Sequence, residues 1–164
     1  MQKHDSMRGY FAYHLHTLME DDNIFLLYGD LGYGMLDNLI ENYPERCINT
    51  GAAEQVMVDM AIGLALEGKI PVCYSITPFL LFRPFESIRT YINHEKIKVK
   101  LIGGGRNLDY EHDGISHISH DDQLFMQHFE NIKSLYPDKK EDVTYNFVKE
   151  MIYNNKATYL NLKR

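Results

Sequence analysis

The sequence has few cysteines, no excess of basic residues and no long apolar run. Its two cysteines, Cys47 and Cys73, belong to no CxxC motif, so neither a disulfide framework nor a cysteine-based zinc site is expected to organise the fold. Seventeen Lys and Arg stand against 23 Asp and Glu, a net charge of -6. This balance argues against a nucleic-acid-binding protein, because such proteins carry a basic excess or a basic stripe. Without a run of about 18 apolar residues, no transmembrane helix is expected.

Length and composition indicate a single globular domain. Apolar residues make up 45% of the chain and charged residues 24%, which is ordinary for a globular protein. Domains commonly contain about 100 to 200 residues, and no internal repeat or Pro/Gly/Ser-rich linker divides residues 1–164. The N-terminal segment has no apolar signal-peptide core. Together with the low cysteine content, this predicts a cytoplasmic protein that does not bind membranes.

Short apolar runs alternate with amphipathic segments along the chain. Strands are expected at residues 24–28, 47–49, 70–76, 98–102 and 157–162. Helices are expected at residues 7–21, 54–67, 79–94, 120–129 and 143–153. Alternating strands and helices predict an α/β fold, with a mostly parallel sheet of about five or six strands flanked by helices. Ligands of such sheets bind at the carboxyl ends of the strands.

Three segments that follow predicted strands carry polar or aromatic side chains of interest. Glu54 stands at the entrance of an apolar helix, where a role in capping or in the helix dipole explains it equally well. Phe79, Phe82 and Phe85 recur at i, i+3 and i+6. By periodicity alone they favour a core-facing stripe, and the alternative is a stacking pocket for a flat heterocycle.

The third segment, residues 111–122, is rich in His and Asp. Its spacing matches no standard zinc motif, so a polar wall of an active site is favoured over a metal site. The preceding glycines, Gly103, Gly104 and Gly105, are expected to break the strand. With Arg106 they form either a phosphate cradle built from backbone N–H groups or a flexible exit from the strand.

Six segments, taken together and in order, resemble the pyrimidine-binding domain of transketolase-like enzymes that depend on thiamine diphosphate, a family that includes 1-deoxyxylulose-5-phosphate synthase. They are Gly29-Asp30-Leu31, Pro44 to Gln55, Gly63-Leu64-Ala65 with Gly68 and Pro71, Thr77 to Phe85, Asp113 to His117, and Asn131 to Pro137. The second is similar to P-x-R-x-x-N-x-G-I-x-E-Q/H. The fourth resembles T-F-x-x-F-x-x-Y/F with Pro78 inserted. The fifth resembles D-G-P-T-H, with Ile115 and Ser116 in place of Pro and Thr.

The resemblance implies a role for each candidate site residue. Glu54 corresponds to the buried acid that exchanges a proton with N1′ of the cofactor's aminopyrimidine and so promotes loss of the C2 proton. The resemblance assigns the remaining roles as follows: Phe79, Phe82 and Phe85 pack on the pyrimidine, Asp30 lies near the thiazolium, His117 acts in catalysis and with Asp113 faces the substrate, and Arg164 binds a donor phosphate. No residue of this chain is expected to bind a metal.

The resemblance also implies a partner. In this family the diphosphate and its divalent metal, Mg²⁺ or Ca²⁺, are held by another domain through a GDG motif followed by NN. That pair of motifs is not present here. We therefore expect a half-site, completed by a separate diphosphate-binding subunit in an α2β2 assembly that transfers a two-carbon ketol unit between phosphorylated or free sugars.

Three other functions remain open from the sequence. The first is a subunit of a two-chain thiamine-diphosphate-dependent 2-oxo-acid decarboxylase. The second is a non-catalytic scaffold or regulatory partner, against which the retention of Glu54 argues. The third is a metal-dependent hydrolase built on the His/Asp-rich loop.

Overall fold

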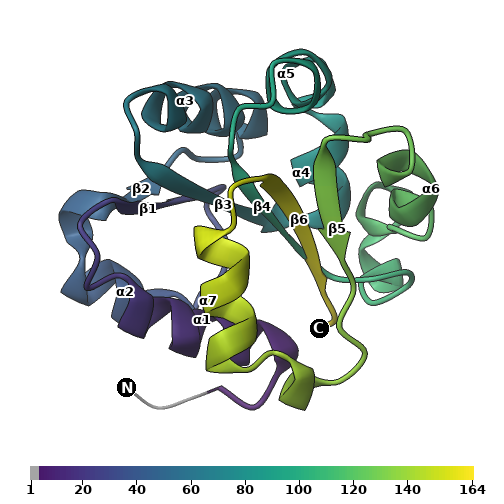
Figure 1. Cartoon of the computed structure of the whole chain (residues 1–164). Coiled ribbons are helices and arrows are strands. Elements are labelled where there is room, and N and C mark those ends of the chain that lie inside the picture. The colour runs from purple at the N-terminus through teal and green to yellow at the C-terminus, as the bar shows by residue number, and fades with distance from the viewer. Residues whose placement is uncertain (1–3) are drawn as a thin grey trace.

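The computed structural model describes residues 4–164, which fold around one six-stranded sheet (Figure 1). The strands are β1 (Ile24–Tyr28), β2 (Cys47–Asn49), β3 (Ile70–Ile76), β4 (Lys100–Gly104), β5 (Ile132–Leu135) and β6 (Ala157–Leu162). They lie in the order β2-β1-β3-β4-β6-β5, and every neighbouring pair is parallel. The predicted parallel α/β architecture is thus confirmed.

Helices cover both faces of the sheet. The longer ones are α1 (Met7–Leu18), α3 (Glu54–Leu66), α7 (Tyr145–Tyr153) and the π-helical segment η2 (Ile88–His94). Shorter ones are α2 (Asp37–Asn42), α4 (Thr77–Phe82), α5 (Phe85–Ser87), α6 (Asp122–Met126), η1 (Pro44–Arg46), η3 (Glu111–Asp113), η4 (Ile115–His117) and η5 (Lys140–Asp142). Figure 1 shows α1, α2 and α7 beneath the sheet and α3 and α5 above it.

Side-chain alternation along the strands divides the core into two layers. Leu26 and Val72 pack with α1, α2 and α7, whereas Leu27 and Cys73 pack with α3, α4 and η2. This follows from the period of two in a strand, which sends successive side chains to opposite faces. Because both faces are buried, central strands such as β1 are continuous apolar runs rather than alternating ones.

The helix expected at residues 79–94 differs in detail. It begins two residues earlier, at Thr77. Pro78 is tolerated there because N–H groups in the first turn have no intrahelical partner. Pro84 then interrupts the segment, so that α4 ends at Phe82 and α5 begins at Phe85. Consequently Phe79 lies in one helix and Phe85 in the next, and the three phenylalanines do not form one stripe.

Two further expectations were wrong in part. No strand was expected at residues 131–137, but they contain the edge strand β5. The strand expected at residues 98–102 runs instead from Lys100 to Gly104, so the glycines do not break it.

None of the helices between residues 4 and 164 combines the length and hydrophobicity that a membrane crossing would need.

Candidate functional site

Glu54 is a buried acid at the carboxyl end of the sheet. Its side chain is 1% exposed. Oε1 accepts a hydrogen bond of 2.8 Å from the hydroxyl of Ser75, near the end of β3, and Oε2 accepts one of 2.6 Å from Nη1 of Arg83, just after α4. A Cβ atom at Gly29, which follows β1, would lie 3.0 Å from Oε1. The acid is therefore enclosed by the ends of two strands and by one helix.

The loops before α3 are fastened by Asn49, the last residue of β2. Its side-chain oxygen accepts hydrogen bonds from the backbone N–H groups of Asp30 (3.1 Å) and Gly51 (2.9 Å). Its amide donates to Oδ1 of Asp30 at 3.0 Å. Asp30 has a positive φ of 52°, which Asp adopts more readily than most residues. These bonds fix where α3 starts and thereby where Glu54 lies.

Arg83 is a site residue that the sequence analysis missed. Its guanidinium carbon lies 3.7 Å from the centre of the Phe79 ring, and its side chain is 43% exposed. The i, i+4 spacing of Phe79 and Arg83 on a helix was a signal for the first contact. No local pattern signals the second contact, with Glu54, because the two residues are 29 positions apart.

His117 joins this group through its ring. The imidazole packs edge-on against Phe79 with 4.8 Å between ring centres, and the Ser116 hydroxyl lies 3.1 Å from Nδ1. The structure thus brings together Glu54, Arg83, Phe79 and His117 from three segments of the chain: the start of α3, α4 with the residue after it, and η4.

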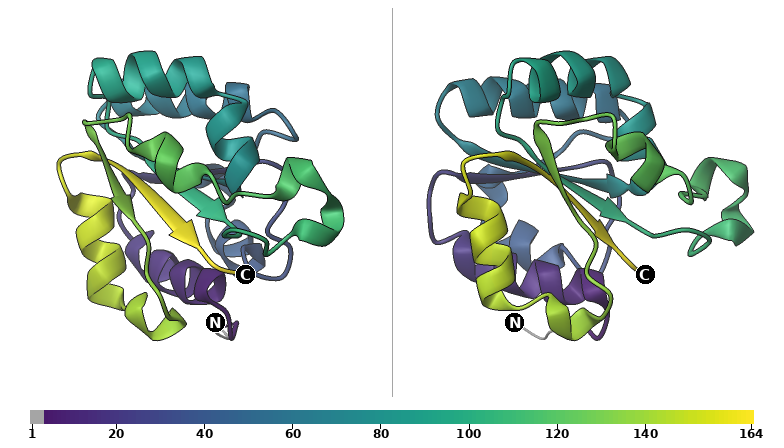
Figure 2. Two further views of the ribbon diagram at one scale, coloured as in Figure 1. Left: turned by 90° about the vertical axis from the view of Figure 1, so that its right-hand side faces the viewer. Right: turned by 45° about the vertical axis from the view of Figure 1, so that its right-hand side comes forward.

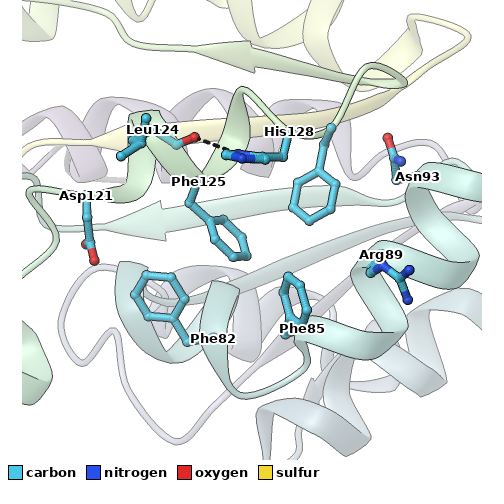
Figure 3. A pocket seen from close by; sticks show the side chains of 9 residues that line it. Phe82, Phe85, Arg89, Asn93, Asp121, Leu124, Phe125 and His128 are labelled. Atoms are coloured by element: carbon cyan, nitrogen blue, oxygen red, sulfur yellow. Dashed lines mark hydrogen bonds between the residues drawn. The ribbon is translucent and has the colours of Figure 1, made fainter.

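Phe82 and Phe85 point instead into an aromatic groove beside α6 (Figure 3). Their rings lie 5.0 Å and 5.4 Å from that of Phe125. The groove has a volume of about 530 Å³ and is lined by Phe82, Phe85, Arg89, Asn93, Asp121, Leu124, Phe125, His128 and Phe129. Phe82 and Phe85 are 39% and 41% exposed, so both rings keep a face open to a partner or ligand.

Asp113 and Arg164 meet in a separate exposed cluster around Tyr110. Nε2 of His112 lies 3.2 Å from Asp113 Oδ2 and 3.5 Å from Nη1 of Arg164. The Arg164 guanidinium lies 5.0 Å from the Tyr110 ring centre. Figure 2 shows the segment between β4 and α6 projecting beyond the strand ends. Within residues 4–164, no ion pair or hydrogen bond links this cluster to Glu54.

The suggested phosphate cradle at residues 103–106 is wrong. Gly103 and Gly104 are buried strand residues. Arg106 is 6% exposed and is used internally, donating to Asn161 Oδ1 (2.6 Å), Asn161 O (2.6 Å) and Pro137 O (3.0 Å). No N–H cradle for phosphate is open to solvent there.

A buried polar network anchors the start of α6. Oδ2 of Asp122 accepts hydrogen bonds from the Tyr159 hydroxyl (2.7 Å) and from the Asn161 amide (3.1 Å). Burial raises the pKa of Asp122, and the Tyr159 hydrogen bond opposes that shift. These bonds attach the start of α6, which follows the loop that contains His117, to β6. Among the described residues there is no cluster of three His, Cys, Asp or Glu side chains placed to bind a metal, so the geometry lends no support to the hydrolase alternative.

Comparison with known proteins extends these observations. The family model described as transketolase, pyrimidine binding domain, matches residues 5–164. The chain is 37% identical over 98 residues to a subunit of the apulose-4-phosphate transketolase of Actinobacillus succinogenes, covering 60% of this chain and 32% of that protein. It is 33% identical over 117 residues to a putative transketolase C-terminal section of Methanocaldococcus jannaschii, covering 71% of this chain and 37% of that protein.

Solved structures show the same fold. One, described as a split-gene transketolase in an inactive beta4 tetramer, matches 97% of this chain and 51% of its own with 27% identity and a TM-score of 0.83. The transketolase of Campylobacter jejuni superimposes with a TM-score of 0.82 at 18% identity, over 96% of this chain and 25% of its own. This chain spans only about a third of the length of each of the two relatives from A. succinogenes and M. jannaschii.

Proposed function

The chain belongs to the family of transketolase pyrimidine-binding domains, and from this premise we propose that it is the pyrimidine-binding subunit of a transketolase-like enzyme that depends on thiamine diphosphate. The observation that carries the proposal is Glu54, an acid 1% exposed at the carboxyl ends of parallel strands. Burying a carboxylate is costly, so a chain that only formed a scaffold would gain little by keeping one there.

The residues around Glu54 fit the aminopyrimidine part of the cofactor. A flat ring needs a polar group at its edge and an apolar surface against its face. Glu54 would supply the first, and the ring of Phe79, which lies beside the same Arg83 guanidinium, would supply the second. Gly29 leaves room beside the carboxylate, since a Cβ atom there would approach Oε1 to 3.0 Å. Among residues 4–164 no group of three His, Cys, Asp or Glu side chains is placed to hold a metal ion.

Thiamine diphosphate, when bound, supplies the carbon nucleophile that takes up the two-carbon unit. Within this chain, Glu54 would exchange a proton with N1′ of the aminopyrimidine, and the Ser75 hydroxyl would hold its other oxygen in place. Phe79 would pack against the ring beside Glu54, and Phe82 and Phe85, which point into the neighbouring aromatic groove, would pack against it from that side and exclude water. Asp30 would lie on the thiazolium side of the site.

Three residues would act on the sugar. His117 would exchange protons with the reacting hydroxyl or carbonyl oxygen, for which imidazole is the common side chain near neutral pH. Asp113 would accept hydrogen bonds from hydroxyl groups. Arg164 would bind a donor phosphate, since guanidinium groups pair well with phosphate oxygens.

The other half of the site would come from a separate diphosphate-binding subunit that holds Mg²⁺ or Ca²⁺. Relatives described as a transketolase subunit and as a split-gene transketolase support this arrangement. We propose an α2β2 assembly acting on phosphorylated or free ketoses. Transfer between sugars is preferred over 2-oxo-acid decarboxylation because the relatives are described as transketolases.

The test is native mass spectrometry of the tagged chain purified from its own source. We expect a second polypeptide, thiamine diphosphate and a divalent metal to emerge with it. A chain that emerges alone and without cofactor after gentle handling would contradict the proposal.

A matched pair of variants then tests the acid. Glu54→Gln should assemble and retain the cofactor mass, but lose about 10²- to 10⁴-fold of its activity on a panel of ketoses, the range typical of general acid–base groups. Glu67→Gln, an exposed acid just after the other end of the same helix, should behave as wild type. Full activity in Glu54→Gln would remove Glu54 from the mechanism.

A further inference from the structure

Arg83 has contacts that the proposed function does not explain. Each carboxylate oxygen of Glu54 already has a donor, the Ser75 hydroxyl on Oε1 and the Arg83 guanidinium on Oε2. The same guanidinium lies over the Phe79 ring, 3.7 Å from its centre. Arg83 is thus a planar group that stacks on an aromatic ring and bonds through its edge to the buried acid.

Those two contacts are the ones expected of a bound aminopyrimidine, which is also planar. Phe79 offers an apolar surface to one such group, and Oε2 of Glu54 offers one hydrogen-bonding position beside it. Because the guanidinium takes both, the ring and Arg83 compete for the same place.

Exposure indicates from which side Glu54 is reached. Ser75 is fully buried and Gly29 is buried, whereas the Arg83 side chain is 43% exposed. Arg83 therefore covers the solvent-facing side of the carboxylate. It lies just after the last residue of α4, with Pro84 following, so its side chain can turn outward without disturbing a helical turn.

We propose that Arg83 is a gate of the cofactor site, which occupies the place of the aminopyrimidine while the site is empty and is displaced when the cofactor binds. The inference rests on the proposed function. Glu54 would keep a partner in the unloaded subunit, since an unpaired buried charge is strongly destabilising. In the loaded subunit the aminopyrimidine ring would replace Arg83 as the partner of Glu54, and the Arg83 guanidinium would move into solvent.

The experiment measures thiamine diphosphate affinity by titration calorimetry in Mg²⁺ buffer, using the complex isolated with the tagged chain after removal of its cofactor. Arg83→Leu removes the competing group, so we expect about fivefold tighter binding, the effect of losing one partly exposed ion pair of favourable geometry. Lys133→Leu is the matched control, because Lys133 is 47% exposed and its ion pair with Glu150, at 3.8 Å on β5, lies outside the site. Its affinity should equal that of wild type.

Arg83→Lys keeps the test informative if the leucine variant does not fold. Lysine retains the charge but has no planar group to stack on Phe79, so binding should tighten about two- to threefold. Unchanged or weaker binding in a folded variant, with normal binding in wild type, would overturn the gate and leave the proposed function standing. Absence of binding in the wild-type complex would overturn both.

Discussion

Lys100 is a buried lysine at the amino end of β4, and its chemistry predicts a measurable dependence of stability on pH. It is 1% exposed. Its ammonium donates to three neutral acceptors, Asn154 O (3.0 Å), Asn154 Oδ1 (3.0 Å) and Lys156 O (2.7 Å). Burial, together with the smaller effect of the nearby charge of Lys98, lowers the pKa of Lys100 from 10.5 to about 8.

The sign and size of the effect follow from linkage. Since the pKa is lower in the folded chain, the unfolded chain binds more protons between about pH 8 and pH 10.5, and stability rises with pH in that window. A tenfold change in proton affinity corresponds to about 1.4 kcal/mol, so the charged form costs the folded state about 3 kcal/mol below pH 8. By about pH 9.5, about 2 kcal/mol of this cost is relieved.

The assay compares urea unfolding of wild type with Lys100→Met, which cannot titrate at this position. The methionine leaves three acceptors unpaired, but that cost does not change with pH. Tyrosines such as Tyr74, whose burial raises its pKa to about 12, are common to both proteins and cancel in the difference.

Between pH 7.5 and pH 9.5 the difference in unfolding free energy should therefore shift by about 2 kcal/mol in favour of wild type. Replacing the exposed Lys149 by Met is the control and should produce no such shift. Parallel curves for wild type and Lys100→Met would refute the reasoning, because they would mean that Lys100 titrates alike in the folded and unfolded chains.

Two other substitutions test how the site is built. Gly29→Ala places a Cβ atom 3.0 Å from Glu54 Oε1, so it should weaken thiamine diphosphate binding in the complex by about tenfold in calorimetry. Gly63→Ala, where nothing lies within 4 Å, should leave that affinity unchanged, and equal effects of the two changes would contradict this account. Arg106→Met removes three internal hydrogen bonds and leaves their buried acceptors unpaired, so it should lower the unfolding free energy in urea by about 3 to 5 kcal/mol. A loss of under about 1 kcal/mol would show that Arg106 is not integral to the fold.

The sheet could be predicted from the sequence wherever a strand is buried on both faces. The run at β1 is apolar throughout and that at β3 is apolar except for Ser75, and both were located correctly. β5 lies at the edge of the sheet, and of its four residues only Ile132 is buried. An edge strand with one buried side chain has no periodic signal, so no strand was predicted there.

The three consecutive glycines were misread for a different reason. Glycine is common in turns because it tolerates positive φ, yet only Gly105 has one, at 89°. The other two are required by close approach. A Cβ atom at Gly103 would lie 2.6 Å from Thr77 Oγ1, and one at Gly104 would lie 2.7 Å from the Tyr74 hydroxyl. Glycine is required there by side chains of neighbouring elements and not by the local backbone conformation. A sequence does not show which atoms will be neighbours.

The same distinction between local and tertiary contacts applies to the residues of the candidate site. The place of Glu54 at a helix entrance is local and could be predicted, as could the i, i+4 contact of Phe79 with Arg83. The ion pair of Arg83 with Glu54 depends on how far α4 lies from α3 across β3, which is decided by packing in the layer that contains Met57, Leu80 and Leu81. Position 83 is not a motif residue of the family resemblance, and its contact with Glu54 depends on tertiary distance. A feature of this kind is particular to this chain and cannot be predicted from its sequence. The Arg83 gate is such a feature, and its test therefore depends on the geometry of this chain rather than on the family pattern.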